Sequence, residues 1–163
     1  MPNSINSAKK SLGQHFLHDG KVLSKIVKAA KVTETDHILE IGPGKGHLTK
    51  KLLLQGCSVT AIELDHDLII GPLKDIAVNP KLEIVEGDAR KVNLKNLIAN
   101  TPYFKLVANL PYNAGTNILR SILLSDLPPQ LSVVMLQKEV ALNITAFPGK
   151  SNILSNLFQV YYD

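Results

Sequence analysis

Short apolar strands and amphipathic helices alternate along almost the whole chain, and this alternation limits the fold more than any other feature of the sequence. Runs such as HILEIG at 37–42 and YFKLVANL at 103–110 are almost continuously apolar, as expected for strands that are buried on both faces of a sheet. A helix is predicted after most of these strands. The pattern therefore predicts a doubly wound α/β fold, in which helices cover both faces of a parallel sheet.

Apolar spacing, glycines and prolines set the expected limits of each element. The expected strands lie at 37–42, 58–64, 81–87, 103–110, 131–137 and 157–163. The expected helices lie at 20–31, 46–56, 66–77, 93–99, 116–126 and 138–146, and Gly71-Pro72 is expected to interrupt the third of these.

Composition excludes several classes of protein. The chain has 163 residues, of which 45% are hydrophobic and 20% charged, so we expect one globular domain and a monomer. There is no long apolar run and no secretory signal, so we expect a cytoplasmic protein without a membrane span. One cysteine, Cys57, cannot form an internal disulfide, and the absence of clustered Cys and His residues predicts no metal site.

Positive charge is concentrated near the N-terminus. Residues 1–31 contain six lysines and one acid, Asp19, whereas the rest of the chain is close to neutral. Such a segment can neutralise the phosphates of a nucleic acid. A solvated lysine-rich helix face is the alternative, and charge alone does not decide between the two.

Glycines and acids follow three successive predicted strands. The first strand runs into the sequence GPGKG at 42–46, where glycines let a ligand approach the backbone. At the next two strand ends, Glu63 can accept hydrogen bonds from ribose hydroxyls and Asp88 from an adenine amino group. Pro43 lacks an N–H that a pyrophosphate could use, which argues against a nicotinamide cofactor. Each feature alone also occurs in turns without a ligand, but the series predicts a nucleoside site.

The tetrapeptide Asn109-Leu110-Pro111-Tyr112 ends the fourth predicted strand. The Asn109 carboxamide oxygen and the Leu110 main-chain carbonyl can both accept hydrogen bonds from an amine. Pro111 stiffens the turn, and Tyr112 can stack on a flat base. The alternative is a turn with a buried tyrosine. After three polar strand ends, the tetrapeptide predicts a pocket for a base that has left its stack.

In these motifs the chain resembles the ribosomal RNA adenine N6-dimethyltransferases, and most closely their small-subunit branch. The matching segments are QHFL at 14–17, EIGPGKGHLT at 40–49, AIELD at 61–65, GDA at 87–89, NLPYN at 109–113, LQKEV at 136–140 and LFQVYY at 157–162. The resemblance implies a Rossmann-like, class I S-adenosylmethionine-dependent methyltransferase that dimethylates adenosines in small-subunit ribosomal RNA.

The resemblance also assigns roles to individual residues. The residues that correspond to cofactor contacts are His15, Leu17, Gly42, Glu63, Asp88 and Asn109, and Gly44 joins them as part of the glycine-rich turn. Asn109, Leu110, Pro111 and Tyr112 correspond to the motif that receives the target adenine.

Two features of the sequence leave alternatives open. GKGHLT and VTAIELDHDL are similar to the large-subunit methyltransferases that confer macrolide resistance, so a large-subunit target is one alternative.

The family continues past LFQVYYD into a further strand and a helical C-terminal domain, whereas this sequence ends at Asp163. We therefore expect a basic leader at 1–19 that closes over the cofactor and an incomplete methyltransferase domain at 20–163. A truncated domain that binds cofactor or RNA without turnover is the second alternative.

Overall fold

The computed structural model describes residues 16–98, 101, 103–112 and 114–145. Its strands are β1 (His37–Ile41), β2 (Ser58–Glu63), β3 (Leu82–Glu86), β4 (Lys105–Asn109) and β5 (Leu131–Met135). Its helices are α1 (Gly20–Ala29), α2 (His47–Leu53), α3 (His66–Ile70), α4 (Leu94–Leu97), α5 (Gly115–Leu123) and α6 (Lys138–Ile144).

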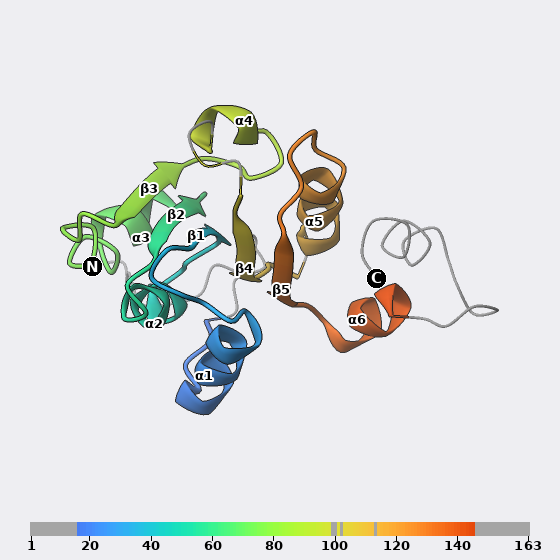
Figure 1. Cartoon of the computed structure of the whole chain (residues 1–163), viewed down its shortest axis with the longest axis horizontal. Helices are drawn as coiled ribbons and strands as arrows, with labels where there is room; N and C mark the ends of the chain where they lie inside the picture. The colour runs from blue at the N-terminus through green and yellow to red at the C-terminus, as the bar shows by residue number, and fades with distance from the viewer. Residues whose placement is uncertain (1–15, 99–100, 102, 113, 146–163) are drawn as a thin grey trace, which may run out of the picture.

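The five strands form one parallel sheet in the order β3-β2-β1-β4-β5 (Figure 1). This order confirms the predicted doubly wound α/β fold. The chain reverses its direction of travel across the sheet between β1 and β4. There the strands pair at Ile38–Lys105 and Leu39–Leu106, whereas β1 and β2 pair along all five residues of β1. The carboxyl ends of β1 and β4 thus border the topological switch point, where ligands bind in this class of fold.

Successive residues of β1 face opposite layers of the core, because side chains alternate along a strand. Ile38 belongs to the layer that includes buried residues of α1 and α2. Leu39 and Ile41 belong to the opposite layer, which includes buried residues of α4 and α5. Glu40 is two residues after Ile38 and therefore faces the same side of the sheet, so its carboxyl group lies on the α1–α2 side.

The chain's one cysteine, Cys57, is fully buried in the α1–α2 layer. Its thiol donates a hydrogen bond to the Leu52 carbonyl oxygen at 3.2 Å. Burial raises the pKa of the Cys57 thiol to about 11, so the reactive thiolate is suppressed in the folded protein.

The predicted interruption at Gly71-Pro72 is confirmed, because α3 ends at Ile70 and turns follow it. A residue that precedes proline is sterically disfavoured in the helical conformation. The other elements overlap their predicted ranges, and most are shorter by a few residues at one or both ends. The strand predicted at 157–163 lies outside the described residues. None of the helices within the described part of the chain is long and apolar enough to cross a membrane.

Candidate functional site

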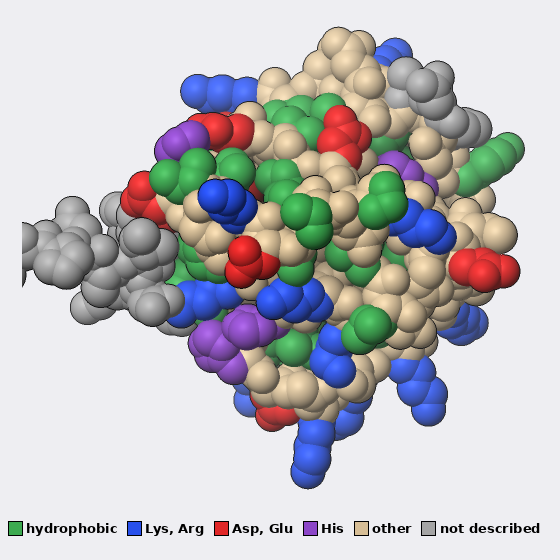
Figure 2. Space-filling model, turned by 90° about the vertical axis from the view of Figure 1, so that its left-hand side faces the viewer, with side chains coloured by type: hydrophobic (Ala, Val, Ile, Leu, Met, Phe, Trp, Pro, Cys, Tyr) green, Lys and Arg blue, Asp and Glu red, His purple; other side chains and the backbone are tan. Residues whose placement is uncertain are grey.

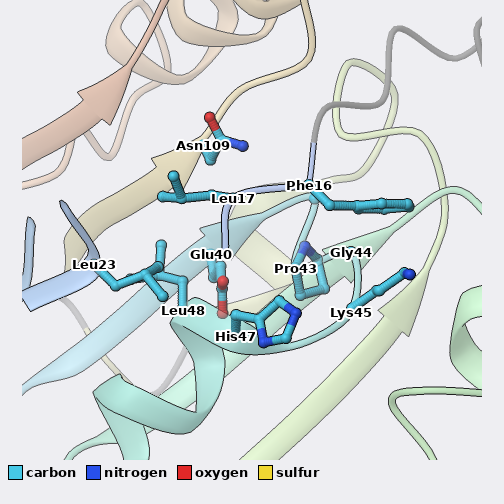
Figure 3. Close-up of a pocket in the computed structure, with 11 residues that line it drawn as sticks. Phe16, Leu17, Leu23, Glu40, Pro43, Gly44, Lys45, His47, Leu48 and Asn109 are labelled. Carbon is cyan, nitrogen blue, oxygen red and sulfur yellow. The ribbon is translucent and has the colours of Figure 1, made fainter. Parts of the chain in front are cut away.

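A pocket lies at the carboxyl ends of β1 and β4 (Figure 3). The residues that line it are Phe16, Leu17, Leu23, Glu40, Gly42, Pro43, Gly44, Lys45, His47, Leu48 and Asn109. Four residues predicted from the sequence, Leu17, Gly42, Gly44 and Asn109, are therefore brought together from three separate parts of the chain. His15, also predicted there, lies outside the described residues.

Two glycines of the turn after β1 adopt left-handed backbone conformations. The φ angle is +66° at Gly42 and +59° at Gly44. A Cβ added to Gly42 would meet no other atom within 4 Å, whereas one added to Gly44 would lie 3.1 Å from Cδ1 of Phe16. Gly42 thus leaves open space beside the turn, and Gly44 leaves room for the leader to pack on it.

The described end of the leader contacts the glycine-rich turn through two pairs of side chains. The Lys45 ammonium lies 5.0 Å from the centre of the Phe16 ring, within range of a cation–π attraction. Nδ1 of His18 lies 3.2 Å from Nε2 of His47. This histidine pair could not be predicted from the sequence, because the two residues are 29 positions apart and match no motif.

Glu63 lies at the carboxyl end of β2 and binds backbone groups of two loops. Its Oε2 accepts a hydrogen bond from the Gly44 amide at 3.1 Å, and its Oε1 accepts from the amides of Leu64 and Asp65, both at 2.9 Å. Burial raises the pKa of Glu63, and the three amide donors act against this shift. A carboxylate has about four acceptor positions, so these amides leave about one unused, but Glu63 is 5% exposed and is not among the residues that line the pocket.

Asp88 lies just past the carboxyl end of β3, outside the lining of the pocket. Its carboxylate accepts hydrogen bonds from the backbone amide and the guanidinium of Arg90. The hydrogen bonds from Arg90 are the main reason that the pKa of Asp88 falls to about 2. The sequence predicted Asp88 as an acceptor but missed Arg90, its partner in the structure.

The Asn109–Tyr112 segment joins the pocket to the surface. Asn109 lines the pocket, and Leu110 is buried with its amide donating to the Met135 carbonyl at 3.2 Å. The Pro111 carbonyl accepts from the Gly115 amide at 2.7 Å, which ties the turn to the start of α5. Tyr112 is 46% exposed, so the alternative of a tyrosine buried in a turn is wrong.

Glu40 is a pocket residue that sequence reasoning did not single out. It is 1% exposed, and its Oε2 has no hydrogen-bond partner among the described residues. Burial raises the pKa of Glu40 to about 8; the nearby Thr49 hydroxyl acts against this shift, and the charge of Glu63 adds to it. The signal in the sequence is the single acid inside the apolar strand HILEI, since an unpaired buried carboxyl group is costly to maintain.

No set of three His, Cys, Asp or Glu side chains in the described ranges is arranged to hold a metal ion. The pocket instead combines a carboxylate of raised pKa, an open backbone turn and the carboxamide of Asn109. These groups are suited to an organic ligand with hydrogen-bond donors.

The sheet order and the pocket at its switch point define a Rossmann-like fold of the class I methyltransferases. A dimethyladenosine transferase from Plasmodium falciparum has a similar structure, with a TM-score of 0.75 and 30% identity over 90% of this chain and 52% of that one. The 23S rRNA methyltransferase ErmE gives a TM-score of 0.67 and 25% identity, over 79% of this chain and 50% of that one.

Residues 5–163 match the family described as ribosomal RNA adenine dimethylase, and the chain belongs to this family. A curated relative, the ribosomal RNA small subunit methyltransferase A of Dehalococcoides mccartyi, is 39% identical over 154 residues, which are 94% of this chain. The family resemblance seen in the sequence motifs is thus confirmed. The chain spans about half the length of the curated relatives that it matches, 53% in this case.

Proposed function

We propose that this protein dimethylates N6 of adenosines in the RNA of the small ribosomal subunit, with S-adenosylmethionine as methyl donor. The observation that carries the proposal is that Gly42 and Gly44 line the same pocket as Asn109, at the switch point of the sheet. Family membership and the similarity to a small-subunit methyltransferase support this reaction over other methyl transfers. The proposed location is the cytoplasm, where the protein acts as a monomer during ribosome biogenesis.

The pocket fits S-adenosylmethionine on two structural grounds. The buried Oε2 of Glu40, which has no hydrogen-bond partner among the described residues, suits a ligand that donates a hydrogen bond, and the open space beside Gly42 suits a flat group against the backbone. When bound, S-adenosylmethionine supplies a methyl group that is already activated by a sulfonium. Glu63 would hold a ribose hydroxyl through its remaining acceptor position, Asp88 would accept from the adenine amino group, and Leu17 and His15 would cover the ligand.

The residues after β4 would position the target adenine. The Asn109 carboxamide and the Leu110 carbonyl would accept hydrogen bonds from the N6 amino group, which favours a more tetrahedral and more nucleophilic nitrogen. Tyr112, exposed beside them, would stack on the base, which other proteins show to be worth about 1–3 kcal/mol. Pro111 keeps the turn rigid. Positioning is the main catalytic contribution, since the methyl donor needs no further activation.

The proposed partner is the RNA of the small ribosomal subunit. Lys21, Lys25 and Lys28 share one exposed stripe of α1. The lower part of Figure 2, where α1 lies in Figure 1, carries blue side chains with few red ones between them. Clustered lysines attract phosphates by releasing counterions, so this face supports contact with RNA.

The test is transfer of labelled methyl groups from S-adenosylmethionine to small ribosomal subunits that lack the modification. Digestion of the RNA to nucleosides would identify the product. The matched variant is Asn109→Ala, which should keep the folding stability of the wild type but lose most of the transfer. N6,N6-dimethyladenosine made by the wild type and not by the variant would support the proposal.

Other outcomes separate the alternatives. Label found in large-subunit RNA would favour the large-subunit alternative, to which the similarity with ErmE lends some support. Cofactor binding without transfer to either RNA would favour a binding domain without turnover. Native-rate transfer by Asn109→Ala would contradict the catalytic assignment of Asn109.

A further inference from the structure

Arg90 surrounds the carboxylate of Asp88 with hydrogen-bond donors. Oδ1 of Asp88 accepts from the Arg90 backbone amide at 3.0 Å and from Nε at 2.9 Å. Oδ2 accepts from Nε at 3.1 Å and from Nη2 at 2.6 Å. These contacts come from three N–H donors, with the Nε–H shared between the two oxygens, so Arg90 alone engages most of the roughly four acceptor positions of the carboxylate.

Asp88 nonetheless lies at the same edge of the sheet as Glu63, just past the carboxyl end of β3. It follows β3, two strands away from the switch point on the side of Glu63, and its side chain is 15% exposed. The Arg90 side chain is 48% exposed, and its hydrogen bonds lower the pKa of Asp88 despite the opposing effect of burial. The guanidinium therefore covers the acid from the solvent side and can swing away without disturbing the core.

The energetics of such a pair permit exchange. The Arg90 end of this ion pair is 48% exposed, and such a pair contributes little to stability because water solvates the guanidinium when the partners separate. An incoming amino group that donates to Asp88 replaces part of that interaction. A ligand without a donor at this position cannot replace the hydrogen bonds from Arg90. Its own acceptor would instead face the Asp88 carboxylate, which is unfavourable.

We propose that Arg90 is a specificity-determining residue which competes with the amino group of an adenine ring for Asp88. Adenosyl ligands bind by displacing the Arg90 side chain from the Asp88 carboxylate, and the competition lowers their affinity. This inference rests on the proposed function, because it takes Asp88 as the acceptor for the cofactor's adenine.

The test measures the dissociation constant of S-adenosylhomocysteine by calorimetry with the full chain. Arg90→Ala removes the competitor and should bind about two- to fivefold tighter, the change expected for an exposed ion pair. Lys91→Ala is the matched control, since it removes a neighbouring positive charge that also acts on Asp88 but makes none of these hydrogen bonds. It should leave the affinity nearly unchanged.

Two further measurements make the test specific. In an Asp88→Asn background, Arg90→Ala should change the affinity little, because a double-mutant cycle reports the coupling of the two side chains. S-inosylhomocysteine, which carries an oxygen in place of the amino group, should gain no affinity from Arg90→Ala. In the wild type, the Arg90 Nε–H resonance should shift when S-adenosylhomocysteine is added.

Unchanged or weaker binding of S-adenosylhomocysteine by Arg90→Ala would overturn the proposal, because Arg90 would then hold Asp88 in place for the ligand. Equal tightening for the inosine analogue would also overturn it. These results leave the proposed function intact, provided that the wild type binds S-adenosylhomocysteine. Failure of the wild type to bind at all would overturn the proposed function, and this inference with it.

Discussion

Nδ1 of His18 lies 3.2 Å from Nε2 of His47, and this contact joins the leader to the start of α2. The two rings meet edge to face with their centres 5.0 Å apart. A hydrogen bond between two imidazoles requires that at least one of them be neutral. The contact is therefore sensitive to pH. The pKa of His47 is lowered by burial first, and then by the positive charges of His18, Lys50 and Lys45.

The first prediction concerns the pH dependence of this contact. Burial, followed by the positive neighbours, lowers the pKa of His47 from its ordinary value of 6.5. Below pH 6.5 the unfolded chain binds more protons at this position than the folded chain, so the free energy of unfolding should fall as the pH is lowered. His18→Gln should raise the pKa of His47, measured by NMR titration. His66→Gln, at an exposed position, is the control, and an equal rise there would contradict the pairing.

The second prediction concerns Glu40. Its pKa of about 8 in the folded protein means that folding favours the protonated form. From about pH 4.5 to 8 the unfolded chain releases this proton and the folded chain keeps it, so the free energy of unfolding falls as the pH rises. Glu40→Gln removes this loss, and its stability relative to the wild type should grow across that range in urea titrations. The control is Glu34→Gln at an exposed position, whose plot of unfolding free energy against pH should run parallel to that of the wild type. A parallel plot for Glu40→Gln would refute the raised pKa of Glu40.

The third prediction compares Gly42→Ala with Gly44→Ala. Both positions have positive φ angles, so each substitution should cost about 1–2 kcal/mol of backbone strain. Only the methyl group at Gly44 would press on Phe16, at 3.1 Å, so Gly44→Ala should destabilise the chain further. Gly42→Ala should instead lose affinity for S-adenosylhomocysteine, because its methyl group enters open space beside the turn. Chemical denaturation measures the loss of stability, and calorimetry measures the loss of affinity. If the two variants lost the same affinity and the same stability, Gly42 would not face a ligand.

The fourth prediction concerns Tyr112. Because the side chain is 46% exposed, Tyr112→Ala should change the free energy of unfolding by about 0.5 kcal/mol or less. The loss of stacking should lower kcat/KM for the RNA by about tenfold or more, while Tyr112→Phe keeps most of the activity. Tyr103→Ala is the matched control, since Tyr103 is 69% exposed and lies before β4. A similar loss of activity in both alanine variants would mean that the effect is not specific to the tetrapeptide.

The fold could be predicted in most of its detail from the sequence. Strands buried on both faces leave long apolar runs, and glycine or proline at their ends marks the turns, so existence and type of each element were evident. The ends differed because helix termini depend on tertiary contacts. For example, the predicted helix at 46–56 starts at His47 and ends at Leu53 in the structure.

The site was only partly predictable. Parallel strands align their carboxyl ends, so the sequence could place Gly42, Gly44 and Asn109 at one edge of the sheet. Contacts between loops follow no spacing rule, and for this reason the His18–His47 pair was missed. The two acids show a second limit. The sequence placed Glu63 and Asp88 at strand ends, but it could not reveal that backbone amides and Arg90 already occupy most of their acceptor positions.

The burial of Cys57 gives this protein a built-in reporter of its own unfolding. The thiol has no exposed surface and a pKa of about 11, so a thiol-specific reagent can react with it only after the α1–α2 layer opens. The sequence contains no other cysteine, and every labelling event therefore reports the same opening reaction. The rate of modification would rank the stability of all the variants above without an added probe or a change to the sequence.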